Sequence, residues 1–322
     1  MQTRISFKGL WEVLKGSFQG FSDNKVTKLS GSLAYSTVFS MAPLLIVVIY
    51  ICSLFLGKDA AEGKVYYYLE DFLGHDTAIQ LQGIIKNAAI NAHGHFAIIA
   101  GVIILLLGAT SIFSEIQDSI NSIWGLKPKP KKGWLKMIQN RMLSFSVIVS
   151  LGFLLLVSLC VTAFIDGFSK GLAHMFPQVA VVIFYVFNQL ITFAVISLIF
   201  GVIFKVLPDA AIRSRDVLGG AIITALLFMA GKVAISFYIS KSNIGGIYGA
   251  AGSLIVLLVW VYYSSLILYF GAEFTKAYAI KYGSPIHPNK YAVTTKEIEV
   301  ETGKDTVQQK EAKLPESTVI NK

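Results

Sequence analysis

The sequence predicts an all-α membrane protein, a bundle of about six transmembrane helices, and three observations lead to this class. Hydrophobic residues make up 54% of the 322 residues and charged residues only 15%, whereas soluble domains carry about 25% charged residues. Several apolar runs exceed the ~20 residues that cross a hydrocarbon core. Lysine and arginine gather in alternate loops, as they do in multi-pass membrane proteins.

The six predicted spans occupy the longest apolar runs of the chain. They lie near residues 31–56, 95–119, 141–166, 178–205, 216–240 and 247–276. The second span is the least regular, because its sequence turns polar after Thr110. Together the spans predict one membrane domain over residues 31–280.

Lysine and arginine also orient the spans. The N-terminal segment, the loops after the second and fourth spans and the segment after the sixth are rich in these residues, whereas the alternate loops are poor in them. Because positive loops remain in the cytoplasm, both termini are expected there. An even number of spans follows, which agrees with six. The net charge of +9 has the same explanation, so we expect no nucleic-acid partner.

Three segments flank or interrupt the bundle. Within the cytoplasmic segment 1–30, apolar side chains recur at helical spacing over residues 5–21, which predicts an amphipathic helix. This helix would lie in the membrane interface or pack on the protein's own inner face. Residues 57–94 form a predicted helical cap on the outer side. The tail 281–322 is rich in Lys, Glu, Thr and Gln, and we expect it to be disordered.

The first span begins with a polar stretch, LSGSLAYSTVFSMAPLL. Ser32, Ser36 and Ser40 are spaced by four residues and therefore share one side of a helix. Such small hydroxyls let a neighbouring helix approach closely, or they line a polar cavity. A second group of small residues, Gly245 and Gly249, opens the sixth span and predicts tight packing there.

Three polar side chains fall deep in the later spans. Asn188 and Gln189 lie about 15 Å from the outer end of the fourth span, and Lys232 lies about 12 Å from that of the fifth. A lysine is expensive in hydrocarbon, so Lys232 either shares a polar depth with the two amides or extends its ammonium outward to the interface. Together with the serine stripe, these residues form a candidate polar pathway.

A further group of polar residues lies toward the cytoplasmic side. Its members are Glu115, Asp118, Asn121, Arg141, Lys205 and Glu273. In SEIQDSINSIW, Glu115 and Asp118 share one helix side because they are three residues apart. Two interpretations remain open. The group is either a salt-bridge and hydrogen-bond network that ties the helices together, or a gate or lipid-headgroup site.

Three blocks of sequence carry a family resemblance. They are LSGSLAYSTVFSMAPLL, then SEIQDSINSIWGL, then LPDAAIRSRDVLGGAIITALLFMAGKVAISFYIS running into IYGAAGSLIVLLVWVYYSSLILYFGAEFTKAY. The last block is the most specific, with its Pro-Asp, Asp-Val-Leu-Gly-Gly, Tyr-Gly and Gly-Ala-Glu elements. At these blocks the chain resembles the YihY/BrkB family. The resemblance implies a six-helix protein of the bacterial cytoplasmic membrane.

The resemblance also carries a ribonuclease BN label, which the residues do not support. A metal-dependent nuclease needs clustered histidine and carboxylate ligands. The five histidines are His75, His93, His95, His174 and His287, and the first four fall on the predicted outer side. No Walker motif is present. We therefore expect a protein that is not an enzyme, with no catalytic residue, no metal and no cofactor.

Some members of the family are linked by name to virulence and serum resistance, and others to lipopolysaccharide export. These associations imply transport or handling of a lipid or small solute at the envelope, with membrane lipids as partners. The polar sides of the predicted helices are compatible with transport. One alternative is a scaffold protein whose polar stripes only pack helices, and another is a membrane-bound hydrolase. The sequence does not identify the substrate, the coupling ion or the oligomeric state. A homo-oligomer is compatible with it.

Overall fold

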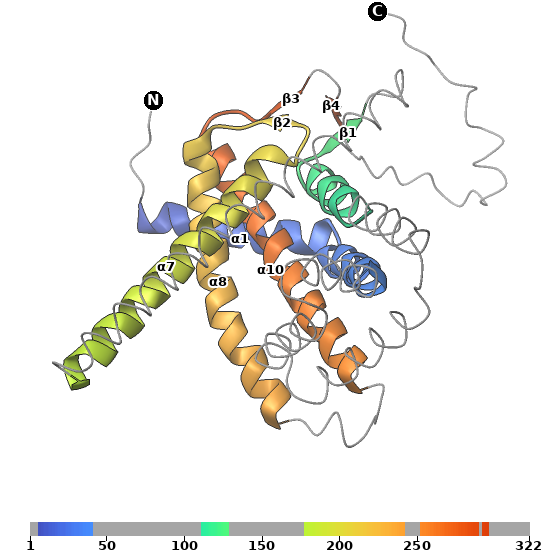
Figure 1. The fold of residues 1–322 in the computed structure, drawn as a ribbon. Helices are drawn as coiled ribbons and strands as arrows, with labels where there is room; N and C mark the ends of the chain where they lie inside the picture. Colours follow the sequence, from blue (N-terminus) through green and yellow to red (C-terminus); the bar gives the residue numbers. More distant parts are fainter. Residues whose placement is uncertain (1–5, 41–110, 129–176, 242–251, 290–291, 296–322) are drawn as a thin grey trace, which may run out of the picture.

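The computed structural model describes residues 6–40, 111–128, 177–241, 252–289 and 292–295 of the chain. The helices with both ends described are α1 (Phe7–Asp23), α7 (Pro177–Val206), α8 (Ser214–Lys241) and α10 (Gly252–Tyr282) (Figure 1). Residues 26–40 and 111–123 are also helical. Four short strands complete this part of the chain: β1 (Leu126–Pro128), β2 (Ala210–Ala211), β3 (His287–Pro288) and β4 (Ala292–Thr294).

Within the described residues, three helices are long and apolar enough to cross a membrane. The qualifying segments are Val186–Val206 of α7, Ser214–Ile235 of α8 and Leu254–Tyr282 of α10. They coincide with the predicted fourth, fifth and sixth spans, and α10 continues beyond the predicted end at residue 276. The predicted third span and the outer cap 57–94 lie outside the described residues, as do most of the first and second spans.

Glycines and threonines interlock α8 with α10. A Cβ atom on Gly220 would meet the Cβ of Thr275 at 2.8 Å, and one on Gly271 would meet the Cβ of Thr224 at 2.9 Å. Each threonine therefore fills the space above a glycine of the antiparallel neighbour. The Thr224 hydroxyl donates to the carbonyl of Gly220 at 2.7 Å, and the Thr275 hydroxyl donates to that of Gly271 at 2.7 Å. Both polar groups are thus satisfied inside their own helices, as a lipid environment requires.

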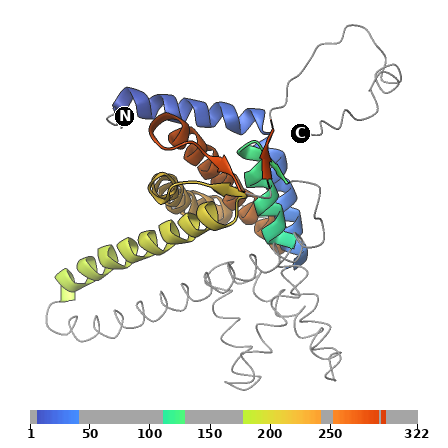
Figure 2. The same ribbon diagram turned by 90° about the horizontal axis from the view of Figure 1, so that it is seen from above.

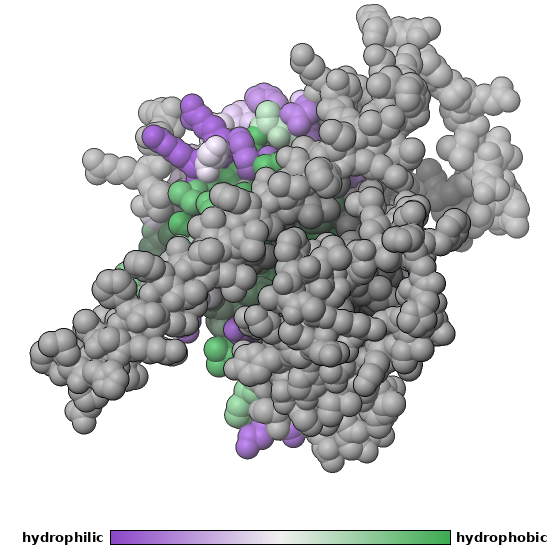
Figure 3. Space-filling model, viewed as in Figure 1, coloured by the Kyte–Doolittle hydropathy of each residue, from purple (hydrophilic) through white to green (hydrophobic). Residues whose placement is uncertain are grey.

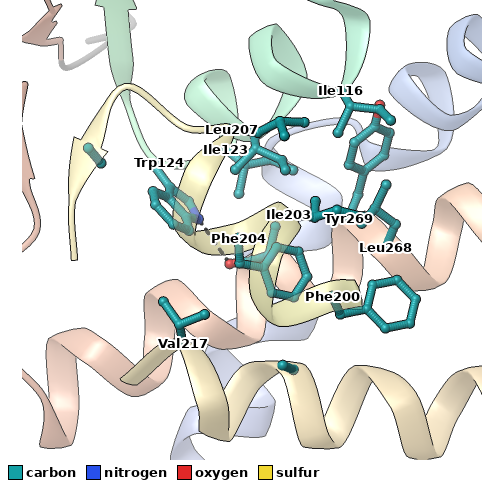
Figure 4. Close-up of a cluster of buried hydrophobic side chains, with 14 of the residues drawn as sticks. Ile116, Ile123, Trp124, Phe200, Ile203, Phe204, Leu207, Val217, Leu268 and Tyr269 are labelled. Carbon is teal, nitrogen blue, oxygen red and sulfur yellow. Dashed lines mark hydrogen bonds between the residues drawn. The ribbon is translucent and has the colours of Figure 1, made fainter. Parts of the chain in front are cut away.

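The core lies where α7, α10 and the helix 111–123 meet. Phe204, Ile120, Ile123 and Tyr269 are completely buried in this cluster. Figure 4 shows the side chains of α7 directed toward those of the helix 111–123. The indole N–H of Trp124 donates to the carbonyl of Ala272 at 3.1 Å, which fastens the end of that helix to α10. The second predicted span therefore ends in a packed contact, not in a surface loop.

Two small antiparallel sheets cover the end of the molecule where α7 ends and α8 begins. Strand β1 pairs with β4, and β2 pairs with β3. We call this the strand end (Figures 1 and 2). The prediction of a disordered tail from residue 281 is wrong for its first part, because residues 287–288 and 292–294 are strands. Backbone hydrogen bonds offset the ordering of this polar segment, for example from Thr295 N–H to the Gly125 carbonyl at 2.8 Å.

Helix α1 packs lengthwise against the last turns of α10. Gly9, Val13 and Ser17 are the buried side chains of α1, and they recur every four residues. A Cβ atom on Gly20 would come within 2.9 Å of the carboxyl carbon of Glu273. The predicted helix 5–21 thus exists with slightly shifted ends, and it packs on the protein. Its aromatic side remains open, with Phe7 90% and Trp11 63% exposed.

The interlock predicts a sharp difference between two glycine substitutions. Gly220→Ala should destabilise the protein by about 1–3 kcal/mol, because the new methyl group overlaps the Cβ of Thr275 and forces α8 and α10 apart. Gly201→Ala is the matched control, since its nearest neighbour would be the Cβ of Ala221 at an ordinary 3.8 Å. The measurement is the Tm of the detergent-solubilised protein. Equal Tm values for both variants would contradict the interlock.

Candidate functional site

A half-buried carboxylate at the strand end, that of Asp209, joins three segments that are far apart in the sequence. The side-chain amides of Gln117 and Asn121 donate to the Asp209 carboxylate at 3.3 and 3.1 Å. The backbone N–H of Asp209 donates to the Asn121 side-chain oxygen at 2.8 Å. The backbone carbonyl of Asp209 accepts a hydrogen bond from the backbone N–H of Asn289 at 2.9 Å. Asp209 therefore connects the helix 111–123, the α7–α8 loop and the segment after α10.

The residues predicted as one cytoplasmic-side network separate into several contacts. Asn121 joins Asp209, as just described. Lys205 donates from its ammonium to the carbonyl of Ile212, across the α7–α8 loop. Glu115 is half-buried and Asp118 exposed on the helix 111–123. Arg141 lies outside the described residues.

Glu273 forms a second, separate contact. Its side chain is only 2% exposed, and its carboxylate accepts from the side-chain amide of Asn24 at 2.5 Å. Asn24 is also the C-cap of α1, where its backbone N–H donates to the Gly20 carbonyl. The buried carboxylate of α10 thus holds the end of α1, and the absence of a side chain at Gly20 leaves room for it.

The residues of the candidate polar pathway are not gathered in the described structure. Ser32 is exposed, and the Ser40 hydroxyl donates to the Ser36 carbonyl at 2.9 Å. The packed side of the helix 26–40 carries Val26 and Leu33 instead. Asn188, Gln189 and Lys232 are also exposed, so no enclosed polar channel connects these six residues within the described part of the chain.

An apolar groove lies between α1, α8 and α10. Its volume is about 430 Å³, and it is lined by Leu14, Phe18, Phe21, Ile223, Leu227, Tyr263, Leu266, Ile267 and Phe270. The rings of Phe18 and Phe270 are 5.0 Å apart and join α1 to α10 at its edge. The α8 and α10 residues belong to the apolar spans, so the groove lies at membrane depth beneath α1.

Charge fixes the opposite edge of α1 to α10. The Lys281 ammonium forms an ion pair with the Glu12 carboxylate. Lys281 lowers the pKa of the Glu12 carboxyl below its ordinary value, first through this hydrogen bond and then through its charge. The pair is exposed to solvent, where such contacts contribute little stability, and it joins the first half of α1 to the last turn of α10.

Four parts of this site, namely Asp209, Gln117, Asn24 and the groove, are not predicted by the sequence. Asp209 belongs to the Pro-Asp element of the family resemblance, and Gln117 belongs to SEIQDSINSIW, but neither was assigned to the polar network. A signal existed for both, since each is a polar residue beside a predicted span end. Asn24 is a turn residue that follows an amphipathic pattern, which is a C-cap signal. No sequence pattern predicts the groove, because the spacing of leucine and phenylalanine residues does not show where three packed helices diverge.

The apolar helices and their lipid-depth packing define a class, an integral membrane protein of α-helical type. The chain belongs to the Virulence factor BrkB family, whose model matches residues 17–293. This confirms the resemblance found in the sequence. The match includes every described helix except the first turns of α1, and it reaches the strand β4.

Membrane proteins of several bacteria are similar to this chain. A UPF0761 membrane protein of Methylibium petroleiphilum is 26% identical over 81% of this chain and 61% of its own length. The chain thus spans about three fifths of that relative. UPF0761 membrane proteins of Mannheimia succiniciproducens and Pseudoalteromonas atlantica are 25% and 27% identical, over 79% and 78% of this chain and 85% and 80% of theirs. No solved structure matches the chain.

The Asp209 contact predicts the effect of a single truncation. Asn121→Ala should lower the stability of the protein by about 1–3 kcal/mol, because it removes both a donor to the Asp209 carboxylate and the acceptor of the Asp209 N–H. Ser122→Ala, at an exposed position on the same helix, is the control and should be neutral. The Tm of both purified variants measures this. An unchanged Tm for Asn121→Ala would show that the Asn121 amide is not needed to hold Asp209 in place.

Proposed function

We propose that this membrane protein binds and moves a lipid at the cytoplasmic side of the bilayer, without changing it chemically. The apolar groove between α1, α8 and α10 carries the proposal. Its volume of about 430 Å³ falls in the range of about 300–1,000 Å³ that is usual for ligand sites. Except for the Tyr263 hydroxyl, its lining offers only hydrocarbon and aromatic surface, which suits an acyl chain and not a polar solute.

The charge pattern supports the cytoplasmic placement. The described residues of the strand end include Lys127 of β1 and Arg213 of the α7–α8 loop. In the sequence, the N-terminal segment, the loop after residue 123 and the segment after α10 are all rich in lysine or arginine. Positive loops remain in the cytoplasm. In Figure 3 the coloured surface at this end is hydrophilic and turns hydrophobic below it. In this proposal the protein lies in a bacterial inner membrane, with both termini on the cytoplasmic side.

The main competing function is a scaffold protein whose polar residues only pack helices. The described part of the serine stripe does not favour it, because Ser32 is exposed and the packed side of that helix carries Val26 and Leu33. A scaffold also gives no reason for the groove, since helices that only pack would fill that space with their own side chains.

A substitution that fills the groove tests the proposal. Leu227→Trp places an indole in the groove and should reduce lipid that stays bound after purification by about tenfold or more, because each excluded methylene removes about 0.8 kcal/mol of binding. Leu226→Trp is the matched control, since Leu226 is the neighbouring exposed residue of α8 and does not line the groove. Bound lipid is counted by native mass spectrometry of protein released from nanodiscs.

Equal lipid retention by the two tryptophan variants would contradict the proposal and favour the scaffold. The unmodified protein must retain lipid for the comparison to hold, and a bare unmodified protein would contradict it as well. Matching Tm values for the two variants show that the groove, and not the fold, accounts for any difference.

A further inference from the structure

Helix α1 has three distinct sides, and the structure gives each a different environment. Gly9, Val13 and Ser17 face α10. The next side is apolar, and it contributes Leu14, Phe18 and Phe21 to the groove. Phe7 and Trp11 continue this side beyond the groove, and both are exposed. An aromatic row of this kind is typical of a helix that lies at the bilayer surface.

The charged residues of α1 have different surroundings. Lys15 lies four residues after Trp11 and three before Phe18, so its stem runs beside the aromatic row. Lys8 lies three residues before Trp11, seven before Lys15, and thus on the same edge. Glu12 lies four residues after Lys8, whose charge contributes to lowering the Glu12 pKa, but its ion pair is with Lys281 of α10. The Glu12 carboxylate is therefore paired with α10, while the Lys8 and Lys15 ammonium groups are exposed beside the aromatic row.

We infer that the groove holds an acyl chain of an anionic glycerophospholipid of the cytoplasmic leaflet, with its headgroup at Lys8 and Lys15. This inference rests on the proposed lipid-handling function and names its ligand. The apolar chain and the acidic headgroup match the two surfaces that α1 brings together. A zwitterionic phosphatidylethanolamine carries its own ammonium group, which the two lysines repel, whereas phosphatidylglycerol brings only the phosphate charge.

Sequence position makes a matched control available. Lys25 and Lys28 lie just beyond α1 and are exposed, and neither belongs to the aromatic side of α1. The double variant Lys8→Gln/Lys15→Gln removes the same charge as Lys25→Gln/Lys28→Gln. All four side chains are exposed, so both variants should fold, and equal Tm values check this.

The experiment uses the full chain in nanodiscs of equal parts phosphatidylglycerol and phosphatidylethanolamine, followed by native mass spectrometry of the lipid retained. The unmodified protein and Lys25→Gln/Lys28→Gln should retain phosphatidylglycerol in preference. In Lys8→Gln/Lys15→Gln the preference should fall by roughly fivefold for each lysine removed. Total retained lipid should fall much less, because the groove is unchanged.

Two results would overturn the inference, and they differ in what they leave standing. Lipid retained without preference for phosphatidylglycerol, or a preference lowered equally by both double variants, removes the headgroup assignment but keeps the lipid-handling function. No retained lipid in the unmodified protein removes both. A preference that also survives Leu227→Trp would place the anionic lipid elsewhere and overturn the groove assignment.

Discussion

The close approach of α8 to α10 organises the packing of the described helices. Gly220 and Gly271 each receive a threonine of the other helix, and each threonine bonds back to the glycine carbonyl four residues before it. Lipid tails are as apolar as the surface of a transmembrane helix, so the hydrophobic effect does not drive two such helices together. Their association relies instead on van der Waals contact and on polar groups that are hydrogen-bonded. α10 also contacts α1 along another side and the end of the helix 111–123 through the Trp124–Ala272 hydrogen bond, while α7 packs against α8.

The groove follows from how α1 is held. Glu273 and Asn24 hold one end of α1, and Gly9, Val13 and Ser17 pack it against α10. With these small residues turned to α10, the neighbouring apolar side of α1 faces the space beside α8. Leu14, Phe18 and Phe21 then form one wall of a concave apolar site. One side of α1 therefore packs on α10, while Phe7 and Trp11 on another side are exposed.

The strand end holds together the loops that connect the spans. Asp209 gathers an amide pair from one helix and the backbone of the segment after α10. Buried polar groups of this kind are costly unless fully paired, so they specify one arrangement of the loops. The amide contacts of Asp209 therefore hold these loops together at the strand end.

The amino-acid sequence alone defines the class of the protein, because apolar runs longer than the bilayer core leave few alternatives to transmembrane helices. It also determined the family, the amphipathic character of α1 and the positions of the last three spans. It did not reveal Asp209 as the centre of the polar contacts or Glu273 as the partner of Asn24, because both contacts join residues far apart in the chain.

The small-residue stripes predicted from the sequence are Ser32, Ser36 and Ser40 and the glycines before α10. The interlock uses Gly220 and Gly271 instead, because which side of an apolar helix meets a neighbour depends on how several helices pack together. For the same reason, the groove between α1, α8 and α10 could be found only from the packed structure and not from the sequence.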